Sequence, residues 1–113
     1  MRLRALTIIA TFLSGVVSAS SLENVTIEQL GYDKNYPDRV FIKTSVAPTS
    51  QSRVQCHNDN NWNYVMPLLS PFEGKMYSAL LAAHSAKQKV TLIGTNKCDA
   101  FDTIEGLHVI YTY

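Results

Sequence analysis

The sequence predicts a mainly β fold with one helix, in which five short strands close into a barrel. Five short runs are rich in β-branched and aromatic residues, and one strong helix-start signature stands at residues 70–73. The elements follow the order of three strands, one helix and two strands. A chain of this length can bury one core and is too short for two, so we expect a single domain.

The first 19 residues have the pattern of a secretory signal peptide. Arg2 and Arg4 precede an apolar run over residues 5–17, which is shorter than the roughly 20 residues of a membrane-spanning helix. The run ends in small residues at the spacing that signal peptidase needs, with Ala19 last. We therefore expect a mature domain of residues 20–113 that is secreted or periplasmic, with no membrane insertion after cleavage.

The charge balance argues against a nucleic-acid partner. The chain has 10 Lys and Arg against 9 Asp and Glu, and without Arg2 and Arg4 its net charge is about −1. A domain this close to neutral does not attract polyanions such as nucleic acids or anionic lipid surfaces.

The two cysteines, Cys56 and Cys98, are expected to form a disulfide, because an exported chain meets an oxidising compartment. Closing a loop of this length stabilises a fold by about 4 kcal/mol in the chain-entropy model. The alternative is a zinc site with His57 and His84 as further ligands, although neither cysteine belongs to a CxxC pair.

The first two strands are predicted at residues 24–30 and 39–44, with a segment rich in turn formers at 32–38 between them. In both strands apolar residues alternate with polar ones, which is the period of a half-buried strand. The apolar residues of this pattern are Val25, Ile27, Val40 and Ile42. Gly31 interrupts the alternation and is expected to form a bulge.

A long polar loop and a third strand follow. Residues 45–61 are low in hydrophobicity and are predicted to form a loop that Cys56 anchors. The third strand is predicted at residues 62–69, where Pro67 indicates a sheet edge or a strand end because proline cannot donate a ladder hydrogen bond.

The helix is the clearest local prediction. Ser70 can cap its first turn, Pro71 suits the first helical position, and Glu73 can return a hydrogen bond to the cap residue. Lys87 and Lys89 favour the C-terminal end through the helix dipole. The apolar stripe expected to face the core comprises Phe72, Met76, Leu80 and Ala83, widened by Tyr77, Leu81 and His84.

The last two strands are predicted at residues 90–95 and 107–113, with an acidic loop at 96–106 between them. Three strands, a helix and two strands form the element order of the five-stranded OB-type barrel. Closing the sheet removes the exposed edges that could otherwise promote aggregation.

Four segments carry a resemblance to a known family: 75–83, 89–94, Cys98 and 107–113. There the chain resembles small exported OB-fold proteins of Gram-negative bacteria, which are similar to the B subunits of subtilase cytotoxin and pertussis-like toxins. The resemblance implies a subunit that assembles into a pentamer, binds a cell-surface glycan through its outer surface and carries a separate catalytic A subunit.

Side-chain amides beside aromatic rings indicate a candidate glycan-binding surface. Amides supply hydrogen bonds and an aromatic ring supplies an apolar face for a sugar. The candidate residues are Asn60, Asn61, Trp62, Asn63 and Tyr64, together with Tyr32 and Tyr36 in the first hairpin. The alternative interpretation is that Trp62 packs in the barrel core and the asparagines only form turns.

No catalytic pattern stands out. Ser85 and His84 are helical neighbours whose side chains point apart, and His108 is expected to face solvent. The three acidic residues Asp99, Asp102 and Glu105 lack the spacing of a calcium loop and are expected to form a solvated turn.

We therefore expect a non-catalytic binding protein without a metal or cofactor, possessing glycan affinity and forming an oligomer. The alternative is a monomeric periplasmic accessory or structural protein that has no ligand of its own.

Overall fold

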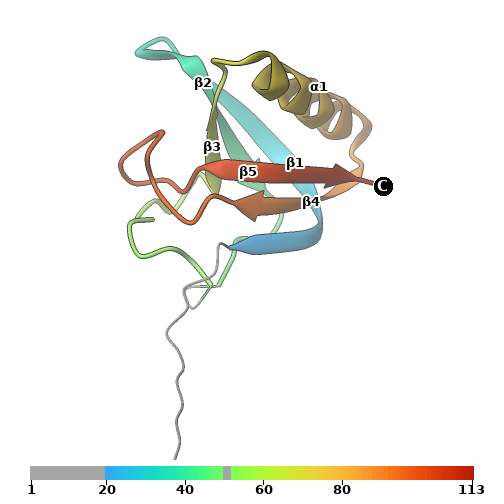
Figure 1. Ribbon diagram of the computed structural model, residues 1–113. Coiled ribbons are helices and arrows are strands. Elements are labelled where there is room, and N and C mark those ends of the chain that lie inside the picture. The colour runs from blue at the N-terminus through green and yellow to red at the C-terminus, as the bar shows by residue number, and fades with distance from the viewer. Residues whose placement is uncertain (1–19, 50–51) are drawn as a thin grey trace, which may run out of the picture.

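The computed structural model describes residues 20–49 and 52–113, so the predicted signal peptide lies outside the described residues. The element order βββαββ is confirmed (Figure 1). The elements are β1 (Ser21–Asp33), β2 (Tyr36–Thr44), β3 (Tyr64–Pro67), α1 (Pro71–Ala86), β4 (Lys89–Gly94) and β5 (Leu107–Thr112).

The strands form one sheet in the order β3-β2-β1-β4-β5, and the long strand β1 is its centre. β1 curves so that its first part pairs with β4 and its last part with β2, in both cases antiparallel (Figure 1). A parallel bridge between Val65 and Gly106 joins the start of β5 to β3, and the Val65 amide donates to the Glu105 carbonyl at 3.1 Å. This bridge closes the sheet, which confirms the five-stranded OB-type barrel.

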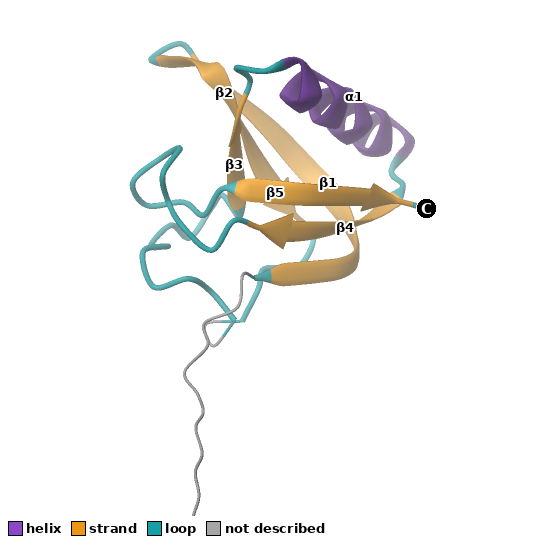
Figure 2. Cartoon of the chain, viewed as in Figure 1, coloured by secondary structure: helices purple, strands orange, loops and turns teal. Residues whose placement is uncertain are grey.

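The barrel interior holds the main core, and α1 covers one side of it (Figure 2). The predicted inward residues of β1 and β2 are all buried, and the helix contributes Met76, Leu80 and Ala83. Two members of the predicted helix stripe are wrong: Phe72 is 65% exposed and Leu81 is 38% exposed. The helix docks through a narrow face, because its buried residues Met76, Leu80 and Ala83 follow one another at intervals of four and three positions along one side.

The strand boundaries differ from the prediction in a systematic way. β1 extends beyond 24–30 at both ends, and β2 begins at Tyr36 after a tight turn in which Asp33 Oδ1 accepts a hydrogen bond from the Asn35 amide at 2.9 Å. β3 is shorter than predicted and ends at Pro67, as its missing donor predicted. β1 and β2 are longer than predicted because they pair with each other through polar residues up to the hairpin turn. The strand propensity of single residues does not measure such pairing.

Gly31 lies at an irregularity of the β1–β2 ladder, as predicted, and it also serves packing. It pairs with Phe41, and a register shift of the β1–β2 ladder lies between Gly31 and Asp33. A Cβ at this position would lie 2.7 Å from Cζ2 of Trp62. The absence of a side chain at Gly31 therefore makes room for the indole ring of Trp62 against β1.

Both helix ends follow the predicted chemistry. Ser70 Oγ accepts from the Glu73 amide at 3.2 Å, and Glu73 Oε1 accepts from the Ser70 amide at 3.0 Å, which completes the capping box. At the other end Lys87 adopts a left-handed conformation with φ of 54°, and its amide donates to the carbonyls of Ala83 and His84.

The predicted disulfide is confirmed. Cys56 and Cys98 are bonded, with their Cα atoms 6.1 Å apart and 42 positions apart in sequence. Both sulfurs are consumed, so the zinc alternative with His57 and His84 is excluded. The bond ties the loop before β3 to the loop between β4 and β5.

A second apolar cluster, here called the outer cluster, lies outside the barrel. It consists of the buried residues Phe41, Val65 and Ile104, with Trp62, Ala100 and Phe101 packed against them. The loop between β4 and β5 therefore folds back onto the outer face of β2 and β3, where it shapes the surface described next. No helix in the described part of the chain is long and apolar enough to span a bilayer.

Candidate functional site

An open cleft of about 470 Å³ lies over the outer cluster. Three segments form it: the β1–β2 hairpin, the residues just before β3, and the loop between β4 and β5. Its aromatic residues are Tyr32, Tyr36, Phe41, Trp62 and Phe101. We call it the aromatic cleft.

The rings of the aromatic cleft support one another through edge contacts. The Tyr36 and Phe101 ring centroids are 5.0 Å apart, and those of Phe41 and Phe101 are 5.3 Å apart, both nearly perpendicular. Trp62 lies tilted against Phe41 at 5.8 Å. Such contacts hold the rings in place before any ligand arrives, which lowers the entropy cost of binding.

Tyr32 forms the exposed wall of the cleft. Its side chain is 59% exposed, and its hydroxyl accepts a hydrogen bond from the Tyr77 hydroxyl on α1 at 2.9 Å. Partial burial, which disfavours the charged phenolate, raises the pKa of Tyr32 to about 12. The phenol therefore stays neutral over the physiological range and keeps its hydrogen available to an acceptor.

The polar side chains of the aromatic cleft are acidic or neutral. Asp33, Asp59 and Gln29 line it, and no Lys, Arg or His among the described residues does. Asp59 Oδ1 accepts from the backbone amides of Asn61 and Trp62, at 2.8 Å in each case. This turn places the Asp59 carboxylate and the indole of Trp62 side by side in the cleft.

Of the seven candidate residues, the structure brings three together. Tyr32, Tyr36 and Trp62 all line the aromatic cleft. Trp62 is half-buried in the outer cluster, so the alternative that it packs inside the barrel is wrong. Asn60 and Asn61 are exposed, with Asn60 in a shallower neighbouring pocket beside Arg53 and His57, and Asn61 in the turn around Asp59.

Two candidate residues need correction. Tyr64 is fully buried, and its hydroxyl shares a 2.9 Å hydrogen bond with Ser20 Oγ. Asn63 is also buried, and its Oδ1 accepts from both the amide and the hydroxyl of Thr44 at 2.8 Å. Their polar groups hold the barrel together, so neither residue is available to a ligand. Alternation along β3 points Tyr64 inward, which a count of amides and aromatics does not reveal.

Phe101 lines the cleft and was not predicted, and Asp59 lines it although it was not among the seven candidate residues. Phe101 is the single aromatic residue in the polar loop 96–106, and this contrast is the signal that could have identified it. Asp59 stood within the asparagine-rich segment, but its role depends on the turn it forms with Trp62.

The acidic loop differs from the prediction at one residue. Asp99 and Asp102 are exposed, whereas Glu105, expected in a solvated turn, is fully buried. No group of three or more possible metal ligands occurs within the described residues. His84 and His108 lie as expected. His84 is half-buried at the edge of the helix stripe, with Nδ1 3.0 Å from the Ile27 carbonyl, and His108 is exposed.

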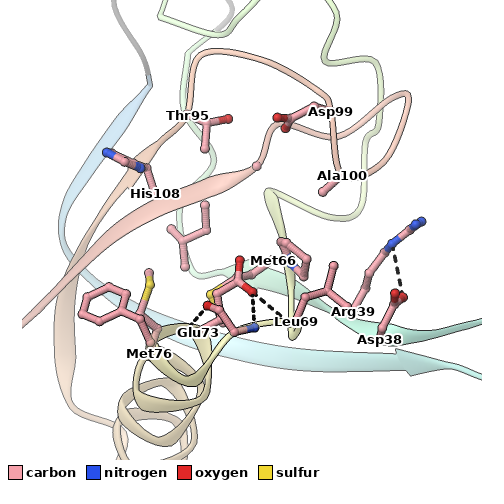
Figure 3. A pocket seen from close by; sticks show the side chains of 15 residues that line it. Asp38, Arg39, Met66, Leu69, Glu73, Met76, Thr95, Asp99, Ala100 and His108 are labelled. Atoms are coloured by element: carbon pink, nitrogen blue, oxygen red, sulfur yellow. Dashed lines mark hydrogen bonds and ion pairs between the residues drawn. The ribbon is translucent and has the colours of Figure 1, made fainter.

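A second cleft of similar volume, about 470 Å³, lies where β3 ends and α1 begins (Figure 3). Met66 and Met76 form part of its floor and the exposed Leu69 part of its rim. Some of its polar groups are already engaged: Glu73 Oε1 accepts from the Leu69 and Ser70 amides, and Arg39 pairs with Asp38 at 3.6 Å. None of the seven candidate residues lines this cleft.

No protein-family model, curated protein or solved structure matches this chain.

Proposed function

We propose that this chain is an exported, non-catalytic binding protein that holds an uncharged glycan in the aromatic cleft. One observation carries the proposal: Tyr32, Tyr36 and Trp62, selected from sequence for their fit to sugar rings, line a single cleft with Phe101. Aromatic faces stack on the apolar faces of sugars, while Asp33, Asp59 and Gln29 offer hydrogen-bonding groups to the hydroxyls.

The position of the cleft on the barrel supports the same proposal. OB-type barrels bind oligosaccharides and oligonucleotides over strands two and three and the loops between strands one and two and strands four and five. The aromatic cleft lies between the β1–β2 hairpin and the β4–β5 loop, above Phe41 of β2. Fold analogy alone does not assign a ligand, so the choice between sugar and nucleic acid rests on the side chains.

Charge favours a sugar without acidic groups. A phosphate backbone or a carboxylated sugar would meet Asp33 and Asp59 with no cationic side chain in the cleft to offset the repulsion. Neutral hydroxyls, in contrast, can donate to these carboxylates.

Loss of one stacking ring is expected to weaken binding at least about tenfold, since a well-placed aromatic contact contributes about 1.4 kcal/mol or more. The test is a glycan array containing neutral and sialylated oligosaccharides, followed by calorimetric titration of the best neutral ligand. Tyr32→Ala and Tyr36→Ala should each lose affinity, while Tyr111→Ala should not, because Tyr111 is about as exposed as Tyr32 but lies outside the cleft. Absence of neutral-glycan binding, or equal affinity of all three variants, would contradict the proposal.

The proposed partners are four further copies of the chain in a ring of five, a catalytic A subunit and a cell-surface glycan. Size-exclusion chromatography with light scattering on the oxidised protein should give a mass five times that of the protomer. A monomer mass at all concentrations would instead favour a periplasmic accessory protein. The glycan proposal is tested separately, because the aromatic cleft is complete within one protomer.

A further inference from the structure

Glu105 is a carboxylate in the interior of the protein. Its side chain is fully buried, and both of its oxygens accept hydrogen bonds. Oε1 accepts from Ser20 Oγ at 2.6 Å, while Oε2 accepts from the Asn96 amide at 3.0 Å and the Ser20 amide at 3.3 Å. A buried carboxylate with this many donors is held in one position.

Among residues 20–49 and 52–113 no ion pair reaches this carboxylate, since the one ion pair joins Asp38 to Arg39 and the charge of Arg53 acts on Glu105 only without direct contact. Burying a charged group without a counter-ion is costly even when hydrogen bonds are made. The position of Glu105 therefore calls for a positive group close to Oε2.

Ser20 can supply that group. It is the residue that follows the predicted cleavage point, and it is itself fully buried. Its nitrogen is already 3.3 Å from Oε2 of Glu105. Its carbonyl accepts from the Gly94 amide at 2.9 Å, which anchors the start of the mature chain beside β4.

We propose that the barrel contains a preformed binding site for the α-ammonium group of Ser20, with Glu105 as its counter-ion. Signal peptidase hydrolyses the Ala19–Ser20 bond: one water is consumed, Ala19 keeps the new carboxylate, and the new amine of Ser20 takes up a proton at neutral pH. One amide N–H is replaced by three N–H donors and a positive charge beside a buried carboxylate.

Gly94 supports this assignment. A Cβ at Gly94 would overlap the Glu105 carboxylate and lie 3.0 Å from its Cγ, so the chain leaves no side chain where the carboxylate must sit. The barrel thus gains its ion pair only after processing. In the precursor Glu105 lacks this ion pair, because Ser20 still carries an uncharged amide nitrogen. This inference rests on the cleavage point and is independent of glycan binding.

The test compares four proteins exported from the full precursor: wild type, a form with one glycine inserted between Ala19 and Ser20, Glu105→Gln, and the combination. Intact mass must show cleavage after Ala19. The inserted glycine moves the ammonium away from Oε2, so it should lower the melting temperature of the wild type by more than about 10 °C. In the Glu105→Gln background the same insertion should cost less than about 4 °C.

The pH dependence provides a second readout. An ammonium beside a carboxylate has a pKa raised above its usual range of about 7.7–8.0, so its stabilisation is present below pH 7.7 and is lost as the pH rises through the folded pKa. The urea midpoint of the wild type should therefore fall between pH 7 and 9.5, and that of the glycine-inserted form should fall less.

Three other titratable groups face Glu105, and all the variants share them. Burial and then the charge of Arg53 lower the pKa of His57, and burial raises the pKa of Tyr64. Burial also lowers the pKa of Arg53. The charge of Glu105 acts on all three groups, so their contributions cancel only between the wild type and the glycine-inserted form, which both keep Glu105.

Cleavage at another bond, or an equal loss on glycine insertion with and without Glu105, overturns the proposal. If the Glu105→Gln forms do not fold, the pH comparison between the wild type and the glycine-inserted form decides. Parallel pH profiles then count against the ion pair.

Discussion

Replacing both Cys56 and Cys98 with alanine is expected to lower the free energy of unfolding by about 4 kcal/mol. The bond closes a loop of 42 positions, and without it the unfolded chain regains the entropy that this closure removes. Urea unfolding of the mature protein at pH 7 measures the change.

Reduction supplies the control for this experiment. A thiol reductant should bring the wild type to the stability of the double variant and leave the double variant unchanged. The bond ties the segment that carries Asp59 and Trp62 to the loop that carries Phe101. Glycan affinity should therefore fall both in the reduced wild type and in the double variant. A double variant within about 1 kcal/mol of the wild type would show that the loops are held by packing alone.

Gly94→Ala is expected to destabilise the protein by about 3 kcal/mol. The new methyl group would overlap the Glu105 carboxylate, which cannot turn away without breaking its hydrogen bonds to Ser20 and Asn96. Thermal unfolding at neutral pH gives the difference.

Gly74→Ala is the matched control for the same chemical change. Gly74 lies in α1, and a Cβ there would meet nothing within 4 Å. This variant should be more stable than the wild type by up to about 1 kcal/mol, because alanine is the better helix former. If both substitutions changed the stability equally, the Glu105 carboxylate could move aside for the new methyl group without a cost in stability.

Some features of the fold could be predicted from neighbouring residues alone. The capping box at Ser70 and the helix length depend on contacts three and four residues apart, and the strands depend on alternation along a few residues. The disulfide followed from there being two cysteines in a chain expected to be exported. Even the barrel order could be inferred, because few arrangements accommodate five strands and one helix in a small domain.

The candidate site could be predicted only in part. Tyr32, Tyr36 and Trp62 were selected because their ring chemistry suits sugars, and chain folding then placed them in one cleft. The same criterion selected Asn63 and Tyr64, which the barrel turns inward. Residue type indicates what a side chain can bind, whereas the direction in which a strand presents it depends on register.

The sequence by itself determined the helix, its caps, the disulfide pairing and the element order, because short-range stereochemistry and cysteine count are sufficient for these. Only the tertiary structure decided that Phe72 stays in solvent, that Phe101 joins the aromatic cleft, and that Glu105 lies buried beside Ser20. These outcomes depend on contacts between segments up to 85 positions apart. Such contacts form when the sheet closes, and no local pattern in the chain encodes them.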